Sequence, residues 1–190
     1  HSTAQNRRPV PARRRARCGE MGAVTLPPGE PELGPWRTVP LRDLLDVVRA
    51  EAGDPVGRPR VVAVDGRGAS GKTTLSARLQ RLVPRSAVVH VDDLSWNEPL
   101  YEWGHLLAED VLEPLHAGRA LSFRPPQWGV HGRPGAIEVP AGLDLVVVEG
   151  TGASHAEHAG LVDATVWVQA DFALAEVTRS RLGSRAAAPP

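Results

Sequence analysis

One eight-residue segment constrains the fold of this chain more than any other feature. It reads Gly66-Arg67-Gly68-Ala69-Ser70-Gly71-Lys72-Thr73 and fits the pattern G-x-x-x-x-G-K-[ST] at every fixed position. A β-branched run over residues 60–65 precedes it and predicts a buried strand. Residues 72–83 follow it and place leucines on one face of a predicted helix. Because a strand, a glycine-rich turn and a helix occur in this order, the segment predicts a loop that binds phosphate groups.

The residue types of this loop explain how it would hold a nucleoside triphosphate. Glycines let the backbone curl until successive N–H groups point inward, and the start of the helix adds a field that favours anions. Lys72 is expected to reach the β- and γ-phosphates, and the Thr73 hydroxyl is expected to ligate Mg²⁺. The residues expected to bind ATP are Gly66, Arg67, Gly68, Ala69, Ser70, Gly71, Lys72, Thr73 and Thr74.

The lysine content of the chain supports this interpretation against a chance match or a purely structural glycine turn. Of 22 basic residues only Lys72 is a lysine. A compact ammonium fits between two phosphates better than a planar guanidinium does. The absence of a second lysine also excludes the Asn-Lys-x-Asp segment with which GTP-specific switch proteins read guanine. The Leu-Ser-Gly-Gly-Gln signature of transporter ATPases is absent as well.

The remaining hydrophobic pattern predicts an α/β fold. The further predicted strands are 86–91, 120–123, 136–139, 143–149 and 163–168, and the further predicted helices are 41–53, 101–116 and 170–182. Strands that alternate with helices predict a parallel β-sheet with helices on both faces, here a P-loop NTPase fold in a single domain. That domain is expected over residues 36–182. A disordered or extended segment, rich in arginine and then in proline, precedes it over 1–35, and a low-complexity tail follows over 183–190.

Composition excludes several classes of protein. No apolar run approaches the ~20 residues that a membrane-spanning helix needs. The only cysteine, Cys18, cannot form an internal disulfide, which favours a reducing, cytoplasmic location. Residues 1–20 carry a balance of +5 and the other residues a balance of −5, so the domain itself is not expected to bind nucleic acid. The basic segment is interpreted as a tag or upstream read-through. A nucleic-acid-binding arm, a membrane-attracted arm or a transit peptide is the alternative.

Carboxylates follow the predicted strands on the side where ligands bind in a parallel sheet. Asp92 and Asp93 follow one strand, and Glu149 ends another. In phosphoryl transfer such groups can hold Mg²⁺, orient the acceptor hydroxyl and accept its proton, although Asp after a strand is also a common turn or cap residue. Asp65 is expected to fix the backbone of the phosphate loop, and His90 is expected in the core.

Residues 60–181 resemble the uridine kinase-like branch of P-loop kinases, which includes nucleoside kinases, pantothenate kinase and phosphoribulokinase. The phosphate loop is generic, whereas the segment Val91-Asp92-Asp93-Leu94-Ser95-Trp96 is more specific. Uridine kinases have an Asp followed by aromatic residues at this place, and that Asp is the base toward the sugar 5′-hydroxyl. The resemblance implies this role for Asp93, with Asp92 as the close alternative. Lys72 and Glu149 complete the expected catalytic set, and Glu149 joins Thr73 as an expected metal ligand.

The same resemblance extends to the expected acceptor pocket. Trp128, His131 and Arg133 keep the aromatic-x-x-His-x-Arg spacing with which uridine kinases contact the pyrimidine base. Here Trp128 could stack on a base and His131 could bind its edge. Packing of a loop by Trp128 and a solvated His131 are the alternative. The family's Tyr-Asp pair is replaced by Pro126-Gln127, a departure from pyrimidine recognition.

The reading that results is an ATP- and Mg²⁺-dependent kinase for a small hydroxyl-bearing acceptor, most like a uridine or cytidine kinase. Arg124 and Arg133 keep open a nucleoside monophosphate acceptor, and pantothenate or another alcohol is a further alternative. Arg179 and Arg181 fall near the family's arginine-rich lid helix, whose Arg-Asp ending is missing here. A lid-truncated protein that binds ATP without turnover is therefore the rival from another class.

Overall fold

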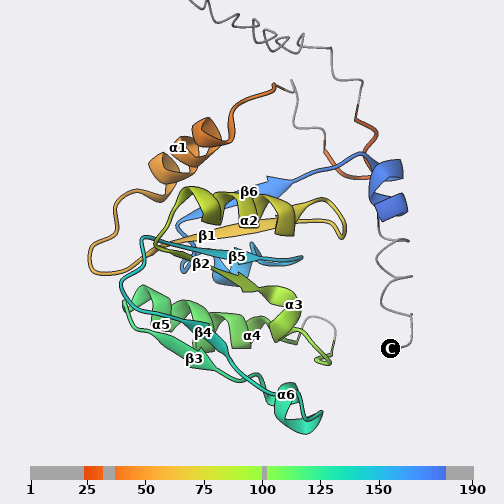
Figure 1. The fold of residues 1–190 in the computed structure, drawn as a ribbon. Helices are drawn as coiled ribbons and strands as arrows, with labels where there is room; N and C mark the ends of the chain where they lie inside the picture. Colours follow the sequence, from red (N-terminus) through yellow and green to blue (C-terminus); the bar gives the residue numbers. More distant parts are fainter. Residues whose placement is uncertain (1–23, 32–36, 100–101, 179–190) are drawn as a thin grey trace, which may run out of the picture.

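The computed structural model describes residues 24–31, 37–99 and 102–178. Its centre is a parallel sheet with the strand order β2-β5-β1-β6 (Figure 1). The strands are β1 (Arg60–Gly66), β2 (Ser86–His90), β5 (Leu145–Glu149) and β6 (Ala164–Val168). Val64 and His90 both stand opposite Glu149 in the register, and Gly66 stands opposite Val168. The carboxyl ends of the four strands therefore meet at one edge of the sheet, as the predicted fold class requires.

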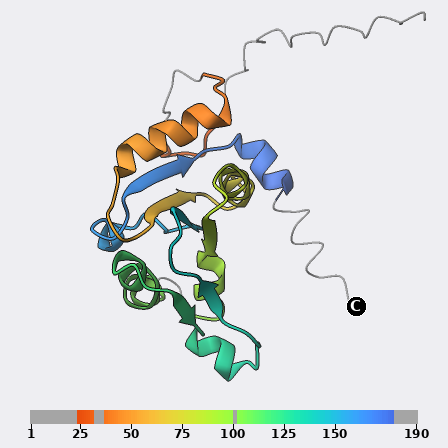
Figure 2. The same ribbon diagram turned by 60° about the vertical axis from the view of Figure 1, so that its left-hand side comes forward.

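Helices cover both faces of this sheet (Figures 1 and 2). Val62 and Val64 pack with α1 (Leu41–Ala52) and α2 (Lys72–Leu82) on one face. Val61 and Ala63 pack on the other face, and the helices there are α4 (Gly104–Leu107), the π-helical turn η1 (Ala108–Leu112) and α5 (Glu113–His116). Because alternate side chains of β1 are buried on opposite faces, the strand reads as a continuous apolar run. The expected α/β architecture is confirmed.

A small second sheet lies at one end of the domain. β3 (Leu121–Phe123) pairs antiparallel with β4 (Ile137–Val139), and α6 (Pro126–Val130) lies between them. The chain also forms the short helix α3 (Val91–Leu94) and the 3₁₀ turn η2 (Ala156–His158), and residues 172–178 are helical. Within the described part of the chain, no helix is long and apolar enough to cross a membrane.

Two sequence-based boundaries need correction. The strand expected over 86–91 ends at His90, so Asp92 and Asp93 lie in the first turn of α3 and not on a strand end. The domain expected from residue 36 omits residues 24–31, yet these contact it, because the N–H of Phe172 donates to the carbonyl oxygen of Thr25 at 2.8 Å.

Asp163 fixes the start of β1 beside β6. Its carboxylate accepts a bidentate pair from Arg58 at 2.7 and 2.8 Å and the N–H of Val61 at 2.7 Å. Burial alone would raise the pKa of Asp163, but the hydrogen bonds from Arg58 and Val61 outweigh it and hold the pKa below its ordinary value. A lowered pKa means that the ionised form is the stabilising one.

We therefore expect Asp163→Asn to lower the free energy of unfolding by about 1–3 kcal/mol at neutral pH, the range for a buried hydrogen bond to a charged group. The difference from the wild type should shrink as the pH falls through the lowered pKa, because the wild-type carboxylate then becomes protonated. Urea unfolding at neutral and acid pH measures this. Asp144→Asn is the control, since Asp144 pairs with Arg85 on the exposed surface. An equal destabilisation at both pH values would contradict the assigned role.

Candidate functional site

The phosphate loop joins β1 to α2 at the carboxyl edge of the sheet. Gly66, Ala69 and Gly71 have φ values of 142°, 63° and 100°, which an L-residue with a side chain rarely adopts. At Gly66 a Cβ atom would lie 2.2 Å from the carbonyl oxygen of Val168, so only glycine fits there. Ala69 holds the left-handed conformation without being glycine, a local strain of a kind that concentrates at functional sites.

Lys72 lies beneath this loop. Its Nζ donates to the carbonyl oxygens of Gly66 at 2.9 Å and Arg67 at 2.8 Å, with Thr151 Oγ1 at 3.4 Å. The residue is 8% exposed. Burial lowers the pKa of Lys72, although the negative charges of Glu149, Asp65 and Asp92 oppose that shift. The ammonium thus sits among backbone oxygens at the base of the loop, with three carboxylates around it.

Glu149 collects two further side chains at the same edge. The Thr73 hydroxyl donates to Glu149 Oε1 at 3.0 Å, and His90 Nδ1 lies 2.6 Å from the same oxygen. Burial would raise the pKa of Glu149, but the hydrogen bonds with His90 and Thr73 outweigh it, so the pKa lies below its usual value. The hydrogen bond to Glu149 is the largest cause of the raised pKa of His90. Thr73 and Glu149 are therefore brought together as the sequence predicted.

His90 is the site residue that sequence reasoning missed. It was expected in the core, whereas its side chain is 43% exposed and contacts Glu149. Its position as the last residue of β2, directly before the two aspartates, was the available signal.

Asp65 has the role expected of it. One carboxylate oxygen accepts the N–H groups of Gly66 at 2.6 Å and Gly152 at 3.0 Å. The other accepts the N–H and the hydroxyl of Ser154 at 2.9 and 2.7 Å. Asp65 thereby ties the start of the phosphate loop to the loop that follows β5.

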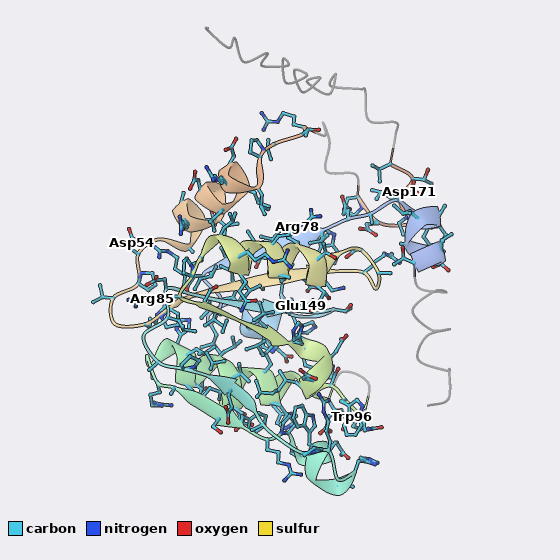
Figure 3. The ribbon with its side chains drawn as sticks, viewed as in Figure 1. Asp54, Arg78, Arg85, Trp96, Glu149 and Asp171 are labelled. Atoms are coloured by element: carbon cyan, nitrogen blue, oxygen red, sulfur yellow. The ribbon has the colours of Figure 1, made fainter. Side chains whose placement is uncertain are left out.

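A cavity of about 510 Å³ lies above the phosphate loop. Loop and helix residues line it on one side, and Asp92, Glu149 and Thr151 line it on the other. The complete lining is Gly68, Ala69, Gly71, Lys72, Thr73, Thr74, Asp92, Glu149, Gly150, Thr151 and Thr178. Figure 3 shows Glu149 in the middle of this edge of the sheet. The cavity brings the phosphate loop and two of the three predicted carboxylates together, whereas Asp93 does not line it.

Asp93 faces the predicted acceptor residues. Arg133 Nη2 lies 2.6 Å from Asp93 Oδ1, and Trp128 Nε1 donates to the backbone oxygen of Asp93 at 2.9 Å. His131 contacts Trp96 edge to face at 5.6 Å, near the end of α3, where Figure 3 labels Trp96. Arg124 donates to the backbone oxygen of Arg133 at 2.8 Å. The four expected acceptor residues thus gather beside α3.

Trp128 is placed differently from what base stacking requires. It is 5% exposed and belongs to the core beneath β3 and β4. The guanidinium of Arg133 lies 3.7 Å from its ring centroid. A base could stack on that face only after displacing Arg133, so the packing role that the sequence left as an alternative describes Trp128 better. The expected lid residues Arg179 and Arg181 lie outside the described residues.

The side chains present fit a magnesium ion held with a nucleotide. Among the described residues, no group of three or more His, Cys, Asp and Glu side chains could hold a metal by itself. Mg²⁺ with nucleotides needs only one or two protein oxygens, because water and phosphate supply the other ligands. The Thr73 hydroxyl and the Glu149 carboxylate offer such oxygens at one place.

Comparisons with known proteins agree with the architecture. No family model and no curated protein matches the chain. Among solved structures, it is similar to a "putative fructose transport system kinase" from Silicibacter sp. TM1040, with a TM-score of 0.55 and 20% identity over 80% of this chain and 85% of that one. A "possible uridine kinase" from Bacillus stearothermophilus gives a TM-score of 0.46 and 17% identity over 78% and 96%. The first similarity shows that the chain has the fold of a P-loop kinase.

Proposed function

We propose that the protein is a small-molecule kinase that transfers the γ-phosphate of ATP to a hydroxyl group. One observation carries this proposal: the 510 Å³ cavity has a phosphate loop on one side and the carboxylates Asp92 and Glu149 on the other. A site that only bound phosphate would gain nothing from carboxylates facing the anion. A transferase needs them to hold a metal ion and to accept the proton of the attacking hydroxyl.

The donor end of the site is assigned to the loop and its neighbours. Backbone N–H groups of residues 66–74 and the Lys72 ammonium bind the phosphates. Thr73 and Glu149 hold Mg²⁺, which when bound neutralises charge that develops on the transferred group. His90 fixes the Glu149 carboxylate by their 2.6 Å contact. These residues position the triphosphate for in-line attack from the side of α3.

The proton acceptor is assigned to Asp92. Both aspartates lie in the first turn of α3, but only Asp92 lines the cavity above Lys72 and Thr73. Asp93 forms an ion pair with Arg133 and orients that side chain. Position is the first requirement of a general base, so Asp92 takes the role for which the sequence favoured Asp93.

The acceptor is proposed to be a neutral, nucleoside-like alcohol. Arg133 would suit a phosphorylated acceptor only if its charge were available, and Asp93 neutralises it at 2.6 Å. His131 and Trp96 remain beside this pair as groups that could contact a flat ring. Uridine and cytidine are the first candidates, and a nucleoside monophosphate or pantothenate is the alternative.

The proposal is tested by ADP release from the full chain with ATP and Mg²⁺ against uridine, cytidine, nucleoside monophosphates and pantothenate. We expect one acceptor class to raise the rate at least ~100-fold over the reaction without acceptor, a stimulation typical of a positioned general base. Chelating Mg²⁺ should abolish it. Binding of ATP without stimulation by any acceptor would favour a nucleotide-binding protein without turnover. Failure to bind ATP would contradict the proposal as a whole.

A further inference from the structure

A second cavity, of about 230 Å³, adjoins the first at Gly68. It lies between the phosphate loop, the end of β6, the helix 172–178 and residues 24–31, which we call the strap. The complete lining is Pro27, Glu30, Arg67, Gly68, Ser70, Val168, Gln169, Ala170, Phe172, Ala175 and Glu176. A nucleotide whose phosphates occupy the first cavity would carry its base toward this one.

The strap is anchored to the domain at this point. Its Thr25 N–H donates to Asp171 Oδ2 at 3.1 Å, and the Thr25 carbonyl accepts the N–H of Phe172 at 2.8 Å. Figure 3 labels Asp171 beside the strap, and Figure 1 shows the strap running alongside the helix 172–178. One wall of the second cavity is therefore made by a segment far from the other walls in sequence.

Glu30 is the strap residue with the most contacts. Its side chain is 6% exposed and accepts hydrogen bonds from Arg67 Nε at 2.6 Å, Gln169 Nε2 at 2.9 Å and Trp167 Nε1 at 3.4 Å. Burial would raise the pKa of Glu30, but these donors outweigh it and lower the pKa. The carboxylate is thus ionised and saturated by protein donors, so it acts on a ligand through the side chains that it holds.

Gln169 is the side chain that Glu30 orients toward a ligand. Its amide nitrogen donates to both Glu30 Oε1 and the Pro31 carbonyl at 2.9 Å, and two acceptors can be served only by the NH₂ end of the amide. The oxygen end is left buried without a partner. Only five buried side-chain atoms in the described residues lack a partner, and Gln169 Oε1 and Ser70 Oγ, both from residues lining this cavity, are two of them.

We propose that Gln169 selects the base of the nucleotide, and that Glu30 is the positioning residue that sets its amide. The inference rests on the proposed function. An unpartnered acceptor is satisfied by the 6-amino group of adenine, whereas the 6-oxo group of hypoxanthine or guanine is itself an acceptor and leaves Gln169 Oε1 unpaired. A buried hydrogen-bonding group discriminates strongly against a ligand that cannot pair with it. The second cavity is thereby assigned to a 6-aminopurine.

The test compares the affinities of the full chain for ATP, ITP and inorganic tripolyphosphate by calorimetry. ITP differs from ATP at the 6-position of the purine, and tripolyphosphate reports the phosphate site alone. The wild type is expected to bind ATP at least ~10-fold more tightly than ITP, the factor that about 1.4 kcal/mol provides. Gln169→Met, which keeps the length of the side chain but removes the amide, should reduce this ratio to within about threefold without changing tripolyphosphate affinity.

Glu30→Ala tests the positioning role separately. It should lower the ATP-to-ITP ratio because the Gln169 amide can then rotate, whereas Pro28→Ala, on an exposed strap residue, should leave the ratio unchanged. A wild-type ratio near one, or a ratio that survives Gln169→Met in a protein that still binds tripolyphosphate, would overturn the inference. Loss of tripolyphosphate binding by the wild type would instead count against the phosphate site and the proposed function.

Discussion

Lys72→Ala is expected to lower the affinity for ATP and for tripolyphosphate by about 100-fold and to remove measurable transfer. Charge-assisted hydrogen bonds to phosphate are among the strongest that a protein forms, and loss of one preorganised donor at a transferring group typically costs 10²–10³ in rate. The Nζ atom is already held at 2.8–2.9 Å from the carbonyls of Gly66 and Arg67, so little reorganisation is needed when phosphates bind.

Two other variants separate charge from shape. Lys72→Met keeps most of the buried stem and should lose binding to the same extent, because the ammonium is the group that matters. Arg78→Ala removes a positive charge from the exposed surface of α2, labelled in Figure 3, and should leave affinity within about twofold, since exposed charges are screened. Unchanged tripolyphosphate affinity in a folded Lys72→Met protein would show that phosphates bind elsewhere.

The sequence predicted the donor side of the site well because its signals are local. The strand, the loop and the helix around Lys72 lie within about two dozen consecutive residues, and each has its own pattern. Glu149 could also be placed, because parallel strands that are buried on both faces must end at one edge of the sheet. Asp65 followed from the same reasoning.

The acceptor side could not be predicted in the same way because it depends on tertiary contacts. The spacing of Trp128 and Arg133 predicts that they lie together, but not that the guanidinium covers the indole ring. His90 belongs to an apolar run, and only the pairing of β2 with β5 brings it to Glu149. The strap lies in a stretch whose prolines and glycines predict a loop, and nothing local indicates that Glu30 reaches Gln169.

The α3 boundary shows how a small error in an element changes a functional assignment. On a strand extended to residue 91, the choice between Asp92 and Asp93 depends on family resemblance alone. With the strand ending at His90, both lie in a helical turn, where adjacent residues point about 100° apart. One aspartate therefore faces the phosphate cavity and the other faces Arg133.

The two aspartates can be distinguished by a matched pair of variants. Asp92→Asn should lower kcat by about 10²–10⁴ with ATP affinity nearly unchanged, because the amide cannot accept the hydroxyl proton. Asp93→Asn should leave kcat within a few-fold and raise the acceptor KM by roughly fivefold, because a half-exposed ion pair with Arg133 is worth up to about 1 kcal/mol. Steady-state kinetics of ADP release with the preferred acceptor, together with ATP binding by calorimetry, measures both.

The split between kcat and KM is the informative readout, since both substitutions replace a carboxylate by an amide of the same shape one residue apart. A purely structural contribution of α3 would lower both parameters for both variants alike. A large kcat loss confined to Asp93→Asn would return the base to Asp93 and require Arg133 to leave that carboxylate when the acceptor binds. The orientation seen here, with Asp92 across the cavity from the phosphate loop and Asp93 engaged by a guanidinium, favours the opposite result.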